Sequence, residues 1–310
     1  MTLKNPLFYI LAVLTLPLIG TVAPAATITV MEIVDFPSQP VVTSGTVLNK
    51  ISDQADTAGT VTDINGIVQA FIYKFRANHF SGAFHPPGDT AGYTQGRGIN
   101  DRRHVVGEYK RARDGTLHGY RLVHSQGLFQ NLDVAGAMNT IPLGTNNAGD
   151  YCGALTLLDN TQSAFVSLNQ VVTMFSVPGA METFAYQLNT ANQIIGYYTD
   201  TNGVNHGYTR DSAGNLTFPI DFPGSTGTML LGNNDSNWGV GSYTDTFGVT
   251  HGLFFITPDD MQTFDVAGAS STSINGVNVG GLVCGSFVDG TTGKTRGFLG
   301  KIFLDGTSKR

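Results

Sequence analysis

The sequence contains little glutamate and few basic residues, and this scarcity excludes several classes of structure and function. Glu occurs only three times in 310 residues, and Lys and Arg together number 17, whereas Gly numbers 39. Helices favour Ala, Leu, Glu and Lys and tolerate Gly poorly, so the composition predicts an all-β fold of short strands and tight turns. With 41% hydrophobic residues, the chain can bury a large core and is not disordered.

The low content of Lys and Arg also argues against one class of partner. The formal net charge is −6 at pH 7, and nucleic-acid binding needs basic side chains that neutralise phosphates, so we expect no nucleic-acid partner. Seven basic residues nevertheless cluster within a short stretch: Arg97, Arg102, Arg103, Lys110, Arg111, Arg113 and Arg121. Such a cluster is typical of a solvated loop region; the alternative is a docking patch for an anionic partner, with Arg102 and Arg103 as candidate ligand-binding residues.

Common enzyme motifs are missing as well. The sequence has no G-x-S-x-G, H-E-x-x-H, C-x-x-C or P-loop motif. Because Glu is scarce, a hydrolase with a carboxylate pair would have to use Asp, yet the recurring acids are typical of turns: Asp63, Asp200, Asp245 and Asp289. The acids that do not recur are the first places to look for catalysis: Glu108, Asp150 and Glu182.

The first 25 residues predict a signal peptide. Lys4 precedes an apolar stretch over residues 6–19, and Ala23 and Ala25 occupy the small-residue positions that a signal peptidase needs. The stretch is too short for a permanent membrane anchor, and Pro17 interrupts it. We therefore expect a secreted protein, extracellular or periplasmic, with no membrane insertion after cleavage of residues 1–25.

A thirteen-residue motif recurs along the chain. GYYTDTNGVNHGY starts at Gly196, and GSYTDTFGVTHGL, which starts at Gly241, matches it at nine positions. Weaker copies start at Gly59, Gly107, Gly153 and Gly285, and successive copies lie 43 to 48 residues apart. An Asn stands seven residues before the first glycine in five units, with Ser52 in the first unit: Asn100, Asn146, Asn189, Asn234 and Asn278. A period of this length indicates a repeat architecture.

Each unit predicts a small antiparallel sheet. In the fourth unit, TFAYQLN, QIIGYYT, NHGYTR and NLTFPIDF are typical of four strands joined by turn-forming residues. Apolar residues on both faces indicate that each sheet packs between neighbours. Six such sheets predict a six-bladed β-propeller, a single domain over residues 26–310, and an open β-solenoid is the alternative. The repeats span about 46–90, 91–138, 139–181, 182–226, 227–269 and 270–304.

The sixth unit lacks a fourth strand, and the start of the mature chain can supply it. Residues 28–38, ITVMEIVDFPS, match the pattern of NLTFPIDFPGS in the fourth unit. We therefore predict that the N-terminal strand completes the last blade, which closes the ring and removes two exposed edges.

The repeat also determines how the two cysteines are interpreted. Cys152 and Cys284 each precede the first glycine of a unit, in blades 3 and 6, which face each other across a six-bladed ring. A disulfide needs Cα atoms about 4.4–6.8 Å apart, so we expect two buried free thiols.

One position of the repeat is occupied by histidine in three units. The six equivalent residues are Gln69, His118, Ser163, His206, His251 and Arg296. A catalytic or metal-binding histidine needs special neighbours, so this variety favours a structural role, and we expect no metal or other cofactor. His118, His206, His251 and Arg296 are kept as candidate ligand-binding residues.

The repeat resembles the extracellular HAF repeat, named for His-Ala-Phe and found in tandem in exported bacterial proteins. The triplet appears here as His118-Gly119-Tyr120, His206-Gly207-Tyr208, His251-Gly252-Leu253, Ser163-Ala164-Phe165 and Gln69-Ala70-Phe71. The resemblance covers about residues 46–304. It implies export and a repetitive β-fold, and it implies no activity and no catalytic residues.

Together these features favour an exported, non-enzymatic binding or structural protein. Its partner would be an extracellular protein, a carbohydrate or an envelope surface. The alternative is an exported hydrolase or lyase with its active site at the mouth of the propeller channel. In either case, function is expected where the six copies differ.

Overall fold

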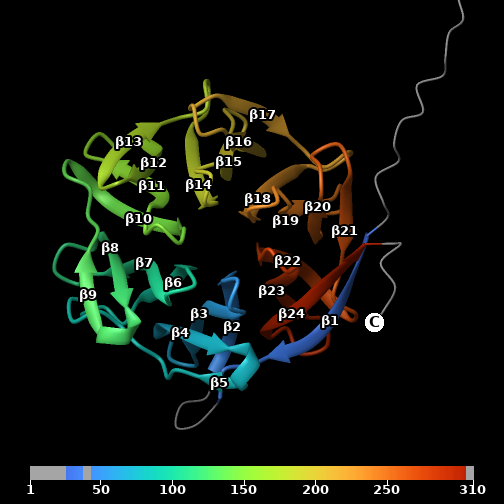
Figure 1. Cartoon of the computed structure of the whole chain (residues 1–310), viewed down its shortest axis with the longest axis horizontal. Helices are drawn as coiled ribbons and strands as arrows, with labels where there is room; N and C mark the ends of the chain where they lie inside the picture. The colour runs from blue at the N-terminus through green and yellow to red at the C-terminus, as the bar shows by residue number, and fades with distance from the viewer. Residues whose placement is uncertain (1–25, 38–42, 305–310) are drawn as a thin grey trace, which may run out of the picture.

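A computed structural model describes residues 26–37 and 43–304 as a closed ring of six four-stranded blades around a central axis (Figure 1). Blades 6 and 1 are joined by a parallel bridge between Thr295 and Gly45. The predicted signal peptide lies outside these residues. None of the helices in the described part of the chain is long and apolar enough to cross a membrane. The predicted all-β propeller of six four-stranded blades is therefore confirmed, and the open solenoid is excluded.

The strands follow the chain blade by blade. Blade 1 contains β2 (Thr43–Ile51), β3 (Asp56–Asp63), β4 (Val68–Lys74) and β5 (His79–Phe80), with the short helix η1 (Phe75–Ala77). Blade 2 contains β6 (Thr94–Ile99), β7 (His104–Lys110), β8 (Leu117–Val123) and β9 (Leu128–Asn131), with η2 (His124–Gln126). Blade 3 contains β10 (Ala137–Thr145), β11 (Tyr151–Leu157), β12 (Gln162–Leu168) and β13 (Val171–Phe175).

The other three blades repeat this order. Blade 4 contains β14 (Glu182–Leu188), β15 (Ile194–Thr199), β16 (Asn205–Arg210) and β17 (Leu216–Ile220). Blade 5 contains β18 (Gly227–Asn233), β19 (Gly239–Thr244), β20 (Thr250–Phe255) and β21 (Met261–Phe264). Blade 6 contains β22 (Ala269–Val277), β23 (Leu282–Asp289), β24 (Thr295–Leu304) and, from the start of the chain, β1 (Ala26–Val34).

The N-terminal strand closes the ring as predicted. β1 pairs antiparallel with β24 from Ala26 opposite Leu304 to Val34 opposite Gly297, and Figure 1 shows the two strands side by side. Val34 is 2% exposed and packs in a cluster with Leu48 of blade 1 and Leu299 of blade 6. The pairing of β1 with β24, called the clasp below, therefore contributes both a hydrogen-bonded strand edge and buried apolar surface.

The innermost strand of every blade carries a β-bulge at the same place. In blade 4 the pairing passes from Ala185 opposite Gly196 to Gln187 opposite Ile195, which leaves Tyr186 without a partner in the ladder. The same shift occurs in the other five blades, where the unpaired residues are Asn49, Arg97, Leu143, Leu231 and Asn275. A bulge changes the direction in which the side chain of the extra residue points, so each blade directs one additional side chain to the ring interior.

The first glycine of each repeat is required by this bulge. A Cβ atom on Gly196 would lie 2.0 Å from the carbonyl oxygen of Phe184, and one on Gly107 would lie 1.9 Å from that of Gln95. The same close approach occurs at Gly153, Gly241 and Gly285. Because no other residue tolerates this contact, the leading glycine of GYYTDTNGVNHGY serves strand packing, whereas Gly203 of the same motif, at φ +82°, shapes the hairpin.

The recurring asparagines join neighbouring blades. Each lies in the turn after the innermost strand, and its Nδ2 group donates to the backbone carbonyl of the equivalent residue in the next blade. The donor–acceptor distances run from 3.0 Å for Asn100 to Asn146 up to 3.4 Å for Asn189 to Asn234. The asparagine column is therefore a hydrogen-bonded belt around one end of the channel.

The two cysteines are free and fully buried, as the repeat predicts. Burial raises the pKa of the Cys152 and Cys284 thiols to about 12. Both side chains are therefore neutral core residues.

Replacing Val34 with Asp tests the clasp. We expect a loss of about 3 kcal/mol or more in the free energy of unfolding, because an unpaired charge would be placed in the apolar cluster that Val34 forms with Leu48 and Leu299. Met31 lies on the same strand and is 52% exposed, so Met31→Asp is the matched control, with an expected change of about 0.5 kcal/mol. Urea unfolding measures both, and equal effects would contradict closure by β1.

Candidate functional site

The six bulge residues line a cavity on the ring axis. This channel cavity has a volume of about 210 Å³ and is lined by Val47, Asn49, Lys50, Arg97, Leu143, Tyr186, Leu231, Asn275 and Ser286. The bulge position holds Asn, Arg, Leu, Tyr, Leu and Asn in blades 1 to 6, whereas the glycine that makes the bulge possible is present in all six. The channel cavity therefore lies where the copies of the repeat differ.

Several bulge residues contact the side chain that follows the first glycine of their own blade. Asn49 Nδ2 donates to Thr60 Oγ1 at 3.1 Å and also to the carbonyl oxygen of Gly96 at 2.8 Å. The rings of Tyr186 and Tyr197 lie 5.5 Å apart. These contacts hold the bulge side chains in fixed orientations around the axis.

Arg97 and Glu108 form the corresponding pair in blade 2. Arg97 Nη2 lies 2.9 Å from Glu108 Oε1, and Nε lies 3.1 and 3.2 Å from the two carboxylate oxygens. The Glu108 side chain is 1% exposed and that of Arg97 is 25% exposed. Burial lowers the pKa of Arg97, but the neighbouring carboxylate of Glu108 raises it by more, so the pKa of Arg97 is raised. Glu108, a candidate for catalysis from the sequence, is thus covered by a permanent cation.

Lys50 reaches across the ring interior. Its Nζ group donates to the backbone carbonyl of Leu231 at 2.6 Å and to that of Asn275 at 2.8 Å, in blades 5 and 6. Nζ also lies 5.2 Å from the centroid of the Tyr186 ring. Burial lowers the pKa of Lys50 to about 8, and the nearby charge of Arg97 acts in the same direction.

The sequence analysis missed Lys50, although the repeat contains a signal for it. The equivalent residues in the other blades are Gly98, Gly144, Gln187, Gly232 and Gly276. A lysine in a column of glycines and one glutamine is the residue that a position-by-position comparison singles out.

A smaller cavity of about 60 Å³ lies at the asparagine end of the channel, with Lys50 between it and the channel cavity. Three carboxylates line this axial mouth and accept backbone hydrogen bonds from the neighbouring blade. Val279 donates to Asp53, Asp53 donates to Asp101, and Thr190 donates to Asp235, at 2.8–2.9 Å. Burial raises the pKa of Asp53, and the carboxylates of Asp101 and Asp235 act in the same direction.

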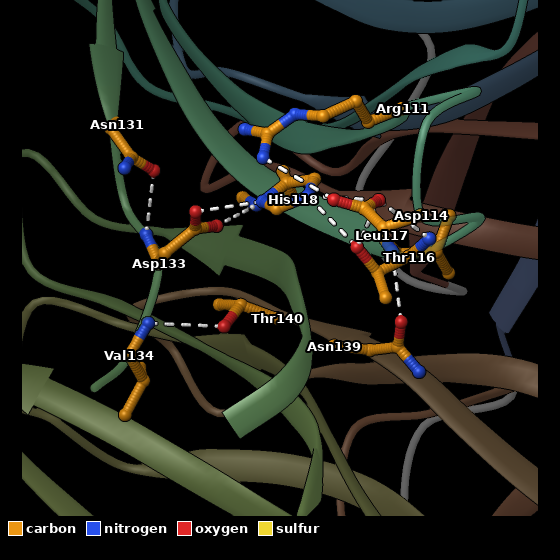
Figure 2. A network of polar contacts seen from close by, with 11 residues as sticks. Arg111, Asp114, Thr116, Leu117, His118, Asn131, Asp133, Val134, Asn139 and Thr140 are labelled. Carbon is orange, nitrogen blue, oxygen red and sulfur yellow. Dashed lines mark hydrogen bonds and ion pairs between the residues drawn. The ribbon is translucent and has the colours of Figure 1, made fainter. Parts of the chain in front are cut away.

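The repeated histidines lie in hairpin contacts away from the axis. Figure 2 shows His118 between Asp133 on one side and Thr116 and Asp114 on the other. Nδ1 lies 2.8 Å from Asp133 Oδ2, and Nε2 lies 2.9 Å from Thr116 Oγ1 and 3.8 Å from Asp114. The histidine thus links the β7–β8 hairpin to the segment that follows β9.

The same arrangement recurs in blades 4 and 5, and blades 3 and 6 have a different residue in this position. His206 contacts Asp221 and Asp200, and His251 contacts Asp265 and Asp245. Arg296 replaces the histidine in blade 6, where it binds Asp35 at 2.7 Å and lies 3.8 Å from Asp289. In blade 3, Ser176 Oγ donates to Ser163 Oγ at 3.2 Å.

In blades 2 to 6 this column is therefore a structural link made separately within each blade. The three histidines do not meet, and no group of three or more His, Cys, Asp or Glu suited to a metal ion occurs in the part of the chain that the structure describes.

The basic cluster of the sequence does not form one surface. Arg102 and Arg103 precede β7, whereas Lys110 ends the strand and Arg111 and Arg113 follow it at the opposite end. Arg103 is paired with Asp56 at 2.5 Å, and Arg121 donates to the carbonyl of Gly149 at 2.5 Å. With Arg97 in the channel, the seven residues have separate environments.

Asp150 and Glu182, the other two acidic residues that do not recur in the repeat, lie in separate environments outside the channel cavity. Asp150 is 8% exposed and accepts a backbone hydrogen bond from Asn169 at 2.8 Å. Glu182 begins β14 and accepts a hydrogen bond from Thr199 at 3.5 Å.

Comparisons with solved structures place the ring among known propellers. The fungal lectin of Aleuria aurantia, a six-bladed β-propeller, matches with 10% identity and a TM-score of 0.52, over 87% of this chain and 99% of the lectin. A Hadza microbial sialidase matches at 8% identity and 0.54, over 84% of this chain and 65% of the sialidase. TolB from Acinetobacter baumannii matches at 8% identity and 0.51, over 84% of this chain, which spans only 56% of that TolB.

These likenesses establish the fold alone, because the identities are low. No family model matches the chain, and no curated protein matches its sequence. The resemblance to HAF repeats accordingly stays a prediction.

The His251 link predicts a pH dependence of stability. The hydrogen bond to Asp265, assisted by Asp245, raises the pKa of His251 above its usual 6.5. The stabilisation from its charged form is full below pH 6.5 and is lost as the pH rises through the raised folded value. The difference in Tm between wild type and His251→Gln should therefore shrink from pH 6 to pH 8.5. The exposed His79 offers the control His79→Gln, and a constant difference for His251→Gln would contradict the link.

Proposed function

We propose that this protein is an exported, non-enzymatic binding propeller that takes a carbohydrate group in its channel cavity. The observation that carries the proposal is the lining by six bulge residues that differ between otherwise similar blades. A purely structural ring would need no variety at positions that have no partner in the backbone ladder. Selection of a ligand does need such variety, because different side chains must contact different parts of the ligand.

The chemistry of the lining suits a polar ligand with an apolar face. Amide, hydroxyl and cationic groups can exchange hydrogen bonds with sugar hydroxyls, and Tyr186 offers an aromatic ring. Asn275 is held by hydrogen bonds to Leu48 and Ser273, and Asn49 by those to Thr60 and Gly96. Side chains fixed before binding lose little conformational entropy when a ligand arrives.

Two further features support the proposal. The Aleuria aurantia lectin recognises fucose on a six-bladed ring, which is the architecture found here. The signal peptide expected over residues 1–25 and the resemblance to HAF repeats favour an extracellular or periplasmic location, where glycans and envelope surfaces are the available partners.

A hydrolase is the second candidate, favoured by the raised pKa of Asp53 beside Asp101 and Asp235 at the axial mouth. These carboxylates already accept backbone hydrogen bonds that join the blades. Asp53→Asn separates the two functions, because it would abolish hydrolysis of a substrate at the mouth and leave binding in the channel cavity intact.

A glycan array probed with the mature protein tests the binding function. Ser286→Phe fills the channel cavity and should weaken binding by at least about tenfold, because the ligand and the new ring would occupy the same volume. Ser270→Phe is the control, since Ser270 lies on the exposed part of β22. Circular dichroism verifies both folds. Unchanged binding by Ser286→Phe would place the ligand elsewhere.

A further inference from the structure

The channel cavity has the opposite charge from the rest of the molecule. The whole chain is acidic, with 23 Asp and Glu against 17 Lys and Arg. The residues that line the channel cavity include two cations, Lys50 and Arg97, and no carboxylate. A local positive charge inside an acidic protein raises the concentration of anions at that place and excludes cations.

The ion pair with Glu108 offsets part of this charge, but it leaves the guanidinium group of Arg97, and not the carboxylate, facing the channel cavity. Glu108 is buried under Arg97 and receives hydrogen bonds from Nε and Nη2. The Nη1 group of Arg97 has no hydrogen-bond partner within the described part of the chain and remains for a ligand. A molecule in the channel cavity therefore meets the guanidinium group and not the carboxylate.

Lys50 adds a second cation held in a fixed place. Two of its three N–H groups donate to the carbonyl oxygens of Leu231 and Asn275, and carbonyl groups leave its positive charge uncompensated. The lowered pKa of Lys50 reflects burial and the like charge of Arg97. An anion bound between the two side chains would offset both the burial of the Lys50 charge and its repulsion from Arg97.

We propose that the channel cavity selects ligands that carry a carboxylate, which is held between Arg97 and Lys50 while Asn49, Asn275 and Tyr186 contact the rest of the molecule. This inference rests on the proposed binding function and names its ligand class. A planar carboxylate matches the donors of a guanidinium group. The cavity of about 210 Å³ has room for a small molecule, and the acidic sugars are the class that joins both requirements.

Paired ligands that differ in one carboxylate test the selection. Isothermal calorimetry on the mature protein compares glucuronate with glucose, galacturonate with galactose, and lactate as a carboxylate without a sugar. We expect each uronate to bind at least about tenfold more tightly than its neutral partner, because charged hydrogen bonds are lost in the neutral sugar. The preference should fall as ionic strength rises.

The double variant Arg97→Gln with Glu108→Gln removes the site without leaving a buried carboxylate unpaired. It should weaken uronate binding by at least about tenfold and leave the weak binding of glucose unchanged. Lys50→Gln should act in the same direction, and Arg76→Gln, at an exposed position, serves as the control. Unfolding curves show whether each variant retains the fold. If a variant does not fold, the preference of the wild-type protein for uronates over neutral sugars tests the proposal.

The outcomes separate this inference from the proposed function. Equal affinity for uronates and neutral sugars would overturn the carboxylate selection and leave carbohydrate binding standing. Absence of binding by every carboxylate would overturn the selection too, while a positive glycan array would still support the binding function. Lactate binding as tight as that of the uronates would support the carboxylate site and contradict a carbohydrate as the ligand.

Discussion

The close approach between a carbonyl group of each innermost strand and the first glycine of the repeat governs the interior of the ring. The contact leaves no room for a Cβ atom at Gly196 or its equivalents, and it accompanies a bulge that turns one residue per blade toward the axis. The glycine is therefore the same in every unit, whereas the residue that it releases from the ladder can vary. One constraint thus produces both the regular ring and its irregular channel.

The other recurring residues explain how the blades hold together. The asparagines link neighbouring blades at one end, and in blades 2, 4 and 5 the His–Asp contacts join a hairpin to the following segment of the same blade. The strand from the start of the chain completes the last blade. The Asp and His of GYYTDTNGVNHGY, which together look like catalytic groups, belong to this framework.

The fold could be predicted from the sequence, but the channel could not. A period of about 45 residues, alternating apolar positions and turn residues determined the number of blades and the closing strand. The bulge was hidden because an extra residue in a short strand does not alter that period. Arg97 was assigned to a surface cluster because six other basic residues follow it closely in the sequence, and Glu108 was considered without its partner. Residues far apart in sequence, such as Lys50 and Leu231, meet only when the ring has closed.

A crystal structure of the mature protein with glucuronate tests the central claim most directly. Electron density for the sugar acid within the channel cavity, its carboxylate contacting Arg97 and Lys50, is the result that the structure predicts. Density for the ligand at the hairpins or between blades, with only water in the channel cavity, would contradict it.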